Sequence, residues 1–277
     1  MYIAFKGTEM TSTEDWAVNL DIEMISHPNW PSEVKFHKGF LDIATMCAEQ
    51  LTQIIENNRP QKIILTGHSK GAAVSALVYL TLAAEKCAGK FPGISFRNVT
   101  FALPMFANEA LKKFIEEKSL KLDKEMLHFV VSGDIVPSML FLGTVHKELS
   151  SVAKSKLTAA TIEKYVKDKK LKEVANRALA TFEEDGHFQF GVDACAPIGK
   201  YIYLEKDSYI ELPDDALEIG KKLSKSLKIL GQISKSSFVS AGTGIGTSVF
   251  DVIKKEHSLE NYKVAIQNSL FGEFSFN

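Results

Sequence analysis

The sequence is poor in cysteine, has no long apolar run and carries almost no net charge over its 277 residues. Cys47, Cys87 and Cys195 lie far apart, and their spacing matches neither a zinc site nor a redox CxxC pair. We therefore expect reduced thiols and a cytoplasmic protein. No segment approaches the roughly 18 to 20 apolar residues of a membrane-spanning helix, and we find no secretory signal peptide. A formal net charge of −1 argues against nucleic acid as a partner.

The composition is that of an ordinary globular protein, with 45% hydrophobic and 24% charged residues. This length is enough to bury a sizeable core, and we predict a single domain over residues 1–277. The apolar run Tyr2–Phe5 is typical of a buried strand. Because this strand begins with no lead-in, we expect a truncated N-terminus, with any upstream targeting signal lost.

Apolar segments alternate between strand-like and helix-like patterns in the first half of the chain. Apolar residues between Phe40 and Ile55 recur on one helix face, Lys62–Thr66 is a continuous apolar run, and Ser69–Ala84 is apolar almost all round. A strand, a helix and a strand follow at Ser95–Leu103, Glu109–Glu117 and Met126–Ser132. The short linkers between these segments predict a mostly parallel central sheet flanked by helices, an α/β architecture.

The other segments are more polar or less regular. We expect a loop over residues 9–36 with at most one short helix near Asp15–Leu20, and a helical insert over residues 146–190. Further predictions are a hairpin at Lys200–Leu204 and Tyr209–Leu212, an amphipathic helix at Ala216–Leu230, a flexible linker at Ser236–Ser248 and a final helix at His257–Leu270.

The insert is basic. Residues 147–177 hold eight lysines and one arginine against three glutamates and one aspartate. Transient contact with an anionic lipid surface is one interpretation. A solvated helical face is the favoured one, because no leucine or aromatic stripe accompanies the charge.

The run Gly67-His68-Ser69-Lys70-Gly71 lies between a predicted strand and a predicted buried helix. A GxSxG motif at such a junction is typical of the nucleophile elbow of α/β hydrolases, in which the serine occupies a strained backbone conformation. The glycines on either side remove side chains that would collide in this tight turn. Ser69 is therefore the candidate nucleophile, exposed at the carboxyl end of the sheet.

A serine hydroxyl needs a base, and in this fold the acid and the histidine follow the serine along the chain. Asp134 follows the strand that ends near Ser132 and is the candidate acid. Of the seven histidines, His27, His37, His68 and His128 precede Asp134, so the chain order disfavours them. The histidines that remain are His146, His187 and His257, and position favours His257, at the start of the last helix.

The chain resembles the class 3 (fungal-type) lipase family. The resemblance lies in Ile3–Thr8, Asp15-Trp16, His37–Phe40, Leu65–Gly71, Thr100–Pro104, Asp134–Pro137, and His257 with Tyr262. These motifs are in family order and extend over nearly the whole chain. They imply an α/β-hydrolase fold and a Ser-Asp-His triad that hydrolyses carboxylic esters, with lipid acylglycerols as the expected substrates. No metal or cofactor is expected.

The resemblance also implies roles for residues that the chemistry alone does not identify. The backbone amides of Thr8 and Lys70 would form the oxyanion hole, and His257 is strengthened over His187 as the base. A rival hypothesis is a non-catalytic, lipase-like scaffold that signals through protein contacts, as in plant immune proteins that resemble this chain. The oligomeric state is not predicted.

Overall fold

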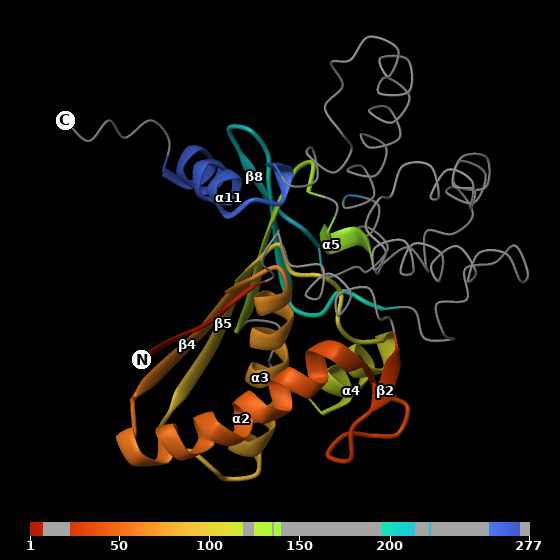
Figure 1. Ribbon diagram of the computed structural model, residues 1–277, viewed down its shortest axis with the longest axis vertical. Coiled ribbons are helices and arrows are strands. Elements are labelled where there is room, and N and C mark those ends of the chain that lie inside the picture. Colours follow the sequence, from red (N-terminus) through yellow and green to blue (C-terminus); the bar gives the residue numbers. More distant parts are fainter. Residues whose placement is uncertain are drawn as a thin grey trace, which may run out of the picture.

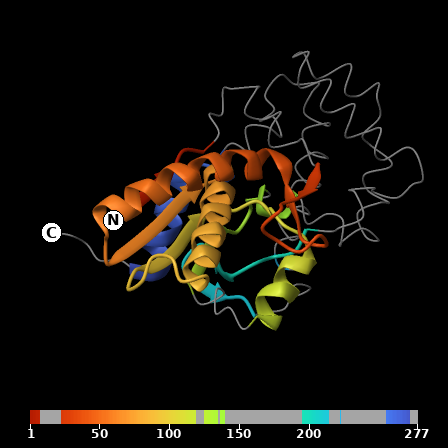
Figure 2. The same ribbon diagram turned by 90° about the horizontal axis from the view of Figure 1, so that it is seen from below.

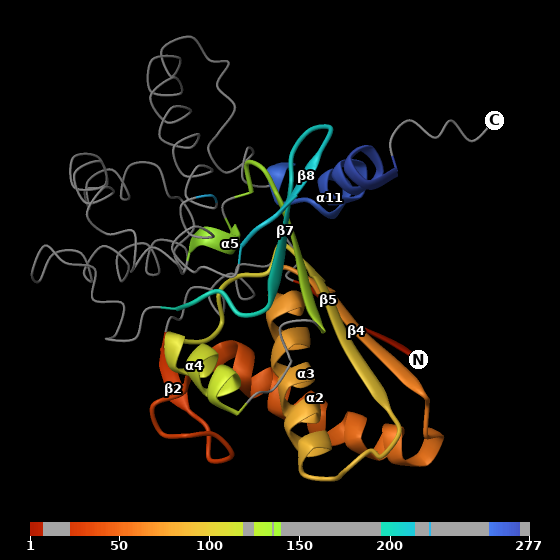
Figure 3. The same ribbon diagram turned by 180° about the vertical axis from the view of Figure 1, so that it is seen from behind.

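A six-stranded sheet runs through the part of the chain that the computed structural model describes, residues 1–7, 23–118, 125–134, 136–139, 195–213, 222 and 255–271 (Figure 1). Its strands, in spatial order, are β1 (Tyr2–Phe5), β4 (Lys62–His68), β5 (Ser95–Phe101), β6 (Met126–Val131), β7 (Lys200–Leu204) and β8 (Tyr209–Glu211). Each neighbouring pair from β1 to β7 is parallel, and β8 returns antiparallel to β7 (Figure 3). The predicted mostly parallel sheet and the predicted hairpin are confirmed.

Helices cover both faces of this sheet. The long α2 (Lys38–Asn58) and the buried α3 (Lys70–Cys87) pack on one face, and α11 (Leu259–Ile266) lies on the other (Figure 2). The main core lies beneath α2 and α3. A smaller core contains Tyr262 and Ala265 of α11 together with side chains from β6 and β7. The sheet is therefore enclosed on both sides, as the continuous apolar strands predict.

The described part of the chain contains three further helical elements. Helix α4 (Glu109–Glu117) follows β5, α5 (Val136–Met139) follows β6, and the π-helical turn η2 (Gln267–Phe271) continues α11. The predicted last helix is thus confirmed in place but changes its hydrogen-bond pattern near its end. The helices in the described part of the chain include no candidate for a membrane span.

Two predictions are corrected. The strand β1 is not buried, because it lies at one edge of the described sheet, where Tyr2 is 80% exposed. The predicted loop over residues 9–36 contains an antiparallel pair, β2 (Met24–Ser26) and β3 (Lys35–His37). Asn108 holds the second strand: its Oδ1 accepts from the Lys35 amide at 3.1 Å, and its Nδ2 donates to the Glu33 carbonyl at 2.8 Å.

Several predicted segments lie outside the described residues. They are the short helix near Asp15–Leu20, the insert over 146–190, the linker Ser236–Ser248, and Ala216–Leu230 apart from Lys222.

Candidate active site

Ser69 lies in the tight turn between the end of β4 and the first residue of α3, and its backbone has φ 57° and ψ −129°. L-residues rarely adopt this region, so the turn stores strain. The Ser69 amide donates to the Phe101 carbonyl of the neighbouring β5 at 3.1 Å. A Cβ on Gly67 would overlap the Gly71 carbonyl, and one on Gly71 would overlap the Phe5 carbonyl. Both glycines are therefore required for the close approach of the backbone, as predicted for the elbow.

Asp134 follows β6 in a tight turn that its own backbone and side chain stabilise. Its amide donates to the Val131 carbonyl at 3.1 Å, and its Oδ1 accepts from the Val136 amide at 2.9 Å. Gly133, with φ 101°, supplies the left-handed residue of the turn. The carboxylate is thereby fixed beyond the carboxyl end of β6.

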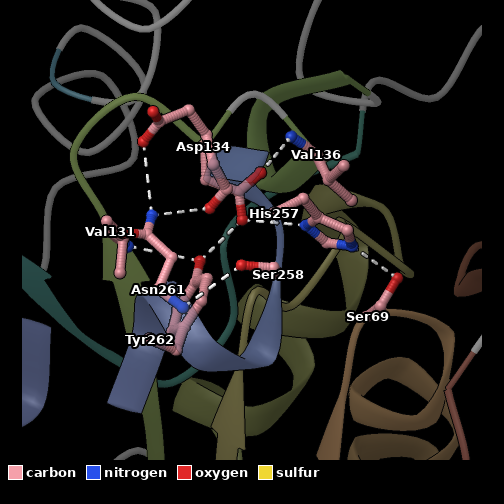
Figure 4. Close-up of polar contacts among 9 residues, drawn as sticks. Ser69, Val131, Asp134, Val136, His257, Ser258, Asn261 and Tyr262 are labelled. Atoms are coloured by element: carbon pink, nitrogen blue, oxygen red, sulfur yellow. Dashed lines mark hydrogen bonds and ion pairs between the residues drawn. The ribbon is translucent and has the colours of Figure 1, made fainter. Parts of the chain in front are cut away.

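His257 lies between the other two candidate residues (Figure 4). Its Nδ1 is 2.9 Å from Asp134 Oδ2 and its Nε2 is 2.7 Å from Ser69 Oγ. With Nδ1 as donor to the carboxylate, Nε2 is the acceptor for the serine hydroxyl. All three side chains are buried, with exposed fractions of 5% or less. The prediction that Ser69 is exposed is therefore wrong: its hydroxyl faces the His257 ring, and the residue is only 5% exposed. The structure thus brings together the serine, the aspartate and the histidine that the sequence analysis selected.

A cap at the start of α11 fixes the backbone that carries His257. The Ser258 hydroxyl accepts from the Asn261 amide at 3.2 Å, which satisfies one of the helix's first N–H groups. The Asn261 side chain donates to the Glu256 carbonyl at 2.9 Å and to Glu256 Oε2 at 3.2 Å. The sequence analysis assigned no role to these residues, although serine before a helix is a recognised capping signal.

Tyr262 is a further site residue whose contact the sequence did not reveal. Its hydroxyl donates to Asp134 Oδ2 at 2.7 Å and accepts from the Val131 amide at 3.2 Å. Burial, followed by the neighbouring Asp134 carboxylate, raises the pKa of Tyr262 well above its usual value. The phenol therefore stays protonated and acts as a donor to the carboxylate.

His68 packs against the candidate base, with its ring centroid 4.8 Å from that of His257. Burial, and next the charge on His257, lowers the pKa of His68 to about 4. His68 therefore stays neutral near pH 7. The neutral His68 ring therefore places no positive charge beside His257.

The remaining candidate histidines and the predicted oxyanion-hole residues either take no part in the Ser69–His257–Asp134 contacts or lie outside the described residues. The His37 ring stacks on Phe40 at 4.0 Å, and His128 Nδ1 lies 2.6 Å from Thr100 Oγ1. Lys70 is the first residue of α3, directly after Ser69. Thr8, His146 and His187 lie outside the described residues. The oxyanion-hole roles of Thr8 and Lys70 stay predictions.

Known proteins resemble this chain in sequence and in structure. Phospholipase A(1) DAD1 of Arabidopsis thaliana is 24% identical over 184 residues, which is 59% of this chain and 38% of that protein. The protein LIH1 of Saccharomyces cerevisiae is 26% identical over 135 residues, 42% of this chain and 38% of that protein. The chain thus spans less than two fifths of the length of these relatives.

Two solved structures illustrate the structural likeness. A triacylglyceride lipase of Rhizomucor miehei is 26% identical, with 50% of each chain covered and a TM-score of 0.40. A lipase of Rhizopus microsporus var. chinensis is 20% identical over 50% of this chain and 46% of that one, with a TM-score of 0.40.

The family description "Lipase (class 3)" matches residues 2–144, which is more than half of the chain. The matched region contains β1, the elbow at Ser69 and the turn at Asp134. The mostly parallel sheet with helices on both faces is the arrangement expected of this family. The chain belongs to the class 3 lipase family and has an α/β-hydrolase fold.

Proposed function

We propose that the protein is a serine hydrolase that cleaves carboxylic esters of lipids through an acyl-enzyme intermediate. One observation carries this proposal: an unbroken set of hydrogen bonds runs from Ser69 Oγ through His257 to Asp134. Two further facts support it: Ser69 lies in a strained elbow, and the chain belongs to the class 3 lipase family. A buried serine that merely closed a turn would need neither the histidine nor the aspartate.

The proposed reaction begins when Ser69 Oγ attacks the ester carbonyl carbon while His257 Nε2 takes the hydroxyl proton. Asp134 holds the imidazole in the tautomer that accepts this proton, and its negative charge stabilises the imidazolium. When the tetrahedral intermediate collapses, His257 gives the proton to the leaving alcohol. Water then attacks the acyl-enzyme by the reverse proton path and releases the carboxylic acid, so Ser69 regains its proton. The reaction uses no metal or cofactor.

The oxyanion of the tetrahedral intermediate needs hydrogen-bond donors. The Lys70 amide is at the N-terminus of α3, where N–H groups and the helix dipole favour negative charge. Together with the Thr8 amide, it is the proposed oxyanion hole. One such donor typically lowers the barrier by about 3 to 4 kcal/mol.

Acylglycerols are the proposed substrates. The relative from Arabidopsis is a phospholipase A(1), which supports a fatty acyl ester as the substrate. Such substrates gather at lipid surfaces, and the basic composition of residues 147–177 supports transient contact there. Sedimentation with vesicles, made with and without anionic lipid, tests this contact. We expect binding only to the vesicles that contain anionic lipid. Absence of binding to both kinds of vesicle would contradict the contact.

Hydrolysis assays on the full chain test the proposed activity. We expect release of p-nitrophenol from acyl esters and of fatty acid from emulsified triacylglycerol, and loss of both with Ser69→Ala. Phosphatidylcholine in parallel distinguishes a phospholipase. A wild-type protein that hydrolyses none of these esters would contradict the proposal and favour the lipase-like scaffold.

A further inference from the structure

Tyr262 is completely buried on the face of α11 that packs against the sheet. Its hydroxyl is satisfied on both sides, because it donates to Asp134 Oδ2 and accepts from the Val131 amide at the end of β6 (Figure 4). A phenol that only filled space would need no such partners, and phenylalanine would pack as well. The hydroxyl therefore joins α11, β6 and the candidate acid at one point.

Two donors share one oxygen of the Asp134 carboxylate. Oδ2 accepts from His257 Nδ1 at 2.9 Å and from Tyr262 at 2.7 Å, while Oδ1 accepts from Val136. A hydrogen bond to the charged form of an acid stabilises that form and disperses its charge. Each donor thus competes with the other for the charge on Oδ2. The carboxylate is therefore a weaker hydrogen-bond acceptor for His257 when Tyr262 also donates to it.

The ring of Tyr262 also packs against His68, the residue whose ring packs against His257. It packs edge-on against His68 with centroids 5.6 Å apart, and His68 lies 4.8 Å from His257. Tyr262 therefore contacts the acid through its hydroxyl and supports the neighbour of the base through its ring. A shift of α11 would disturb both contacts.

We infer that Tyr262 is a positioning residue that holds the Asp134 carboxylate through Oδ2, aims it at His257 and thereby tunes how readily His257 accepts a proton. This inference rests on the proposed function. Removing the hydroxyl leaves a stronger, less well oriented acceptor for His257 Nδ1. The imidazolium is then more stable, so the titration midpoint of His257 rises, while poorer orientation slows the proton transfer.

The groups that face His257 limit what a pH profile can report. Asp134 and the neutral His68 contact its ring, Ser69 is its proton donor, and Tyr262 contacts both Asp134 and His68. The Glu256 carboxylate lies against Gly133 and bonds Asn261. Burial lowers the pKa of His68 to about 4, so the His68 ring stays neutral near pH 7. The Glu256 carboxylate and the His68 imidazole therefore both lie near the site, and the control variant must leave these two side chains unchanged.

The test compares Tyr262→Phe with Tyr203→Phe. Tyr203 also donates from its hydroxyl near the end of β6, to Ser132 Oγ at 3.2 Å. Tyr262→Phe is expected to move the His257 midpoint, followed by NMR of labelled histidine, upward by about one pH unit. The acid limb of kcat/KM should move by the same amount, and kcat should fall about 10-fold with KM unchanged. Tyr203→Phe should change neither.

Two results would overturn the inference. A lower kcat with an unmoved histidine midpoint would show a merely structural role, and unchanged kinetics would show none. The NMR titration does not depend on turnover, so it separates failure here from a wild-type protein that hydrolyses no ester. If Tyr262→Phe does not fold, the hydroxyl proton of Tyr262 in the wild type serves instead. Its resonance should shift as His257 titrates, and a resonance that does not follow this titration would contradict the inference.

Discussion

Ser69 and His257 are 188 positions apart in the chain, yet the Ser69 Oγ and His257 Nε2 atoms are 2.7 Å apart. The serine is held by the turn between β4 and α3, and the histidine by the turn that enters α11 on the opposite face of the sheet. The two side chains meet beyond the carboxyl ends of the parallel strands, where α/β proteins place their ligands.

Replacing Asp134 tests whether its carboxylate orients the His257 imidazole. Asp134→Asn keeps the size of the side chain but presents His257 Nδ1 with an amide, which favours the wrong tautomer. We expect kcat for ester hydrolysis to fall about 10⁴-fold. The control is Asp42→Asn on the exposed face of α2, where Asp42 pairs with Lys38 at 2.8 Å, and it should retain full activity. Comparable activity in the two variants would refute the assigned role of Asp134.

The second glycine of the elbow should be intolerant of a methyl group. A Cβ on Gly71 would overlap the Phe5 carbonyl of β1, which is backbone and cannot move aside. Gly71→Ala should therefore lower the free energy of unfolding by about 3 kcal/mol. Gly89→Ala is the matched control, since Gly89 has φ 90° but open space around it, and its cost is about 1 kcal/mol from backbone strain alone. Urea unfolding measures both, and equal costs would disprove the close approach of β1 and α3.

A buried histidine in β6 should link stability to pH. His128 is fully buried beside Thr100, and burial lowers its pKa to about 3. In the unfolded chain the histidine pKa is about 6.5. Between pH 6.5 and pH 3 the unfolded chain therefore binds a proton at His128 that the folded protein does not bind. The stabilising contribution is thus complete above about pH 6.5 and is lost as the pH falls toward 3, at about 1.4 kcal/mol per pH unit.

Urea unfolding between pH 4 and pH 7.5 checks this linkage. His128→Gln removes the titrating group, so the variant should show a pH slope smaller by about one proton than the wild type. Its absolute stability is expected to be lower because the packing changes, and the slope is therefore the quantity to compare. Identical slopes would show that His128 does not remain neutral in the fold.

The elbow was predictable from sequence because its geometry is local. An apolar strand, two glycines and a buried helix are adjacent in the chain, and the strained φ of Ser69 follows from that order. The chain order of Asp134 and His257 then limited the choice of partners. The same local patterns located the long helix α2 and the hairpin of β7 and β8.

Features that depend on distant contacts were not predictable. The strand β3 has three residues and no alternating pattern, and it is held by Asn108, 73 positions away from Lys35. An apolar run like that of β1 does not reveal whether one or two neighbours will flank it. The hydrogen bond from Tyr262 to Asp134 spans 128 positions and exists because α11 packs on the second face of the sheet.

Covalent labelling by a fluorophosphonate probe tests the central claim most directly, because only an activated serine reacts. Mass spectrometry should locate one phosphonyl group on Ser69 of the wild-type protein, with no label on Ser69→Ala and slow labelling of His257→Gln. A folded wild-type protein that remains unlabelled, or one labelled equally with and without His257, would contradict the assignment of Ser69 as a nucleophile activated by His257 and Asp134.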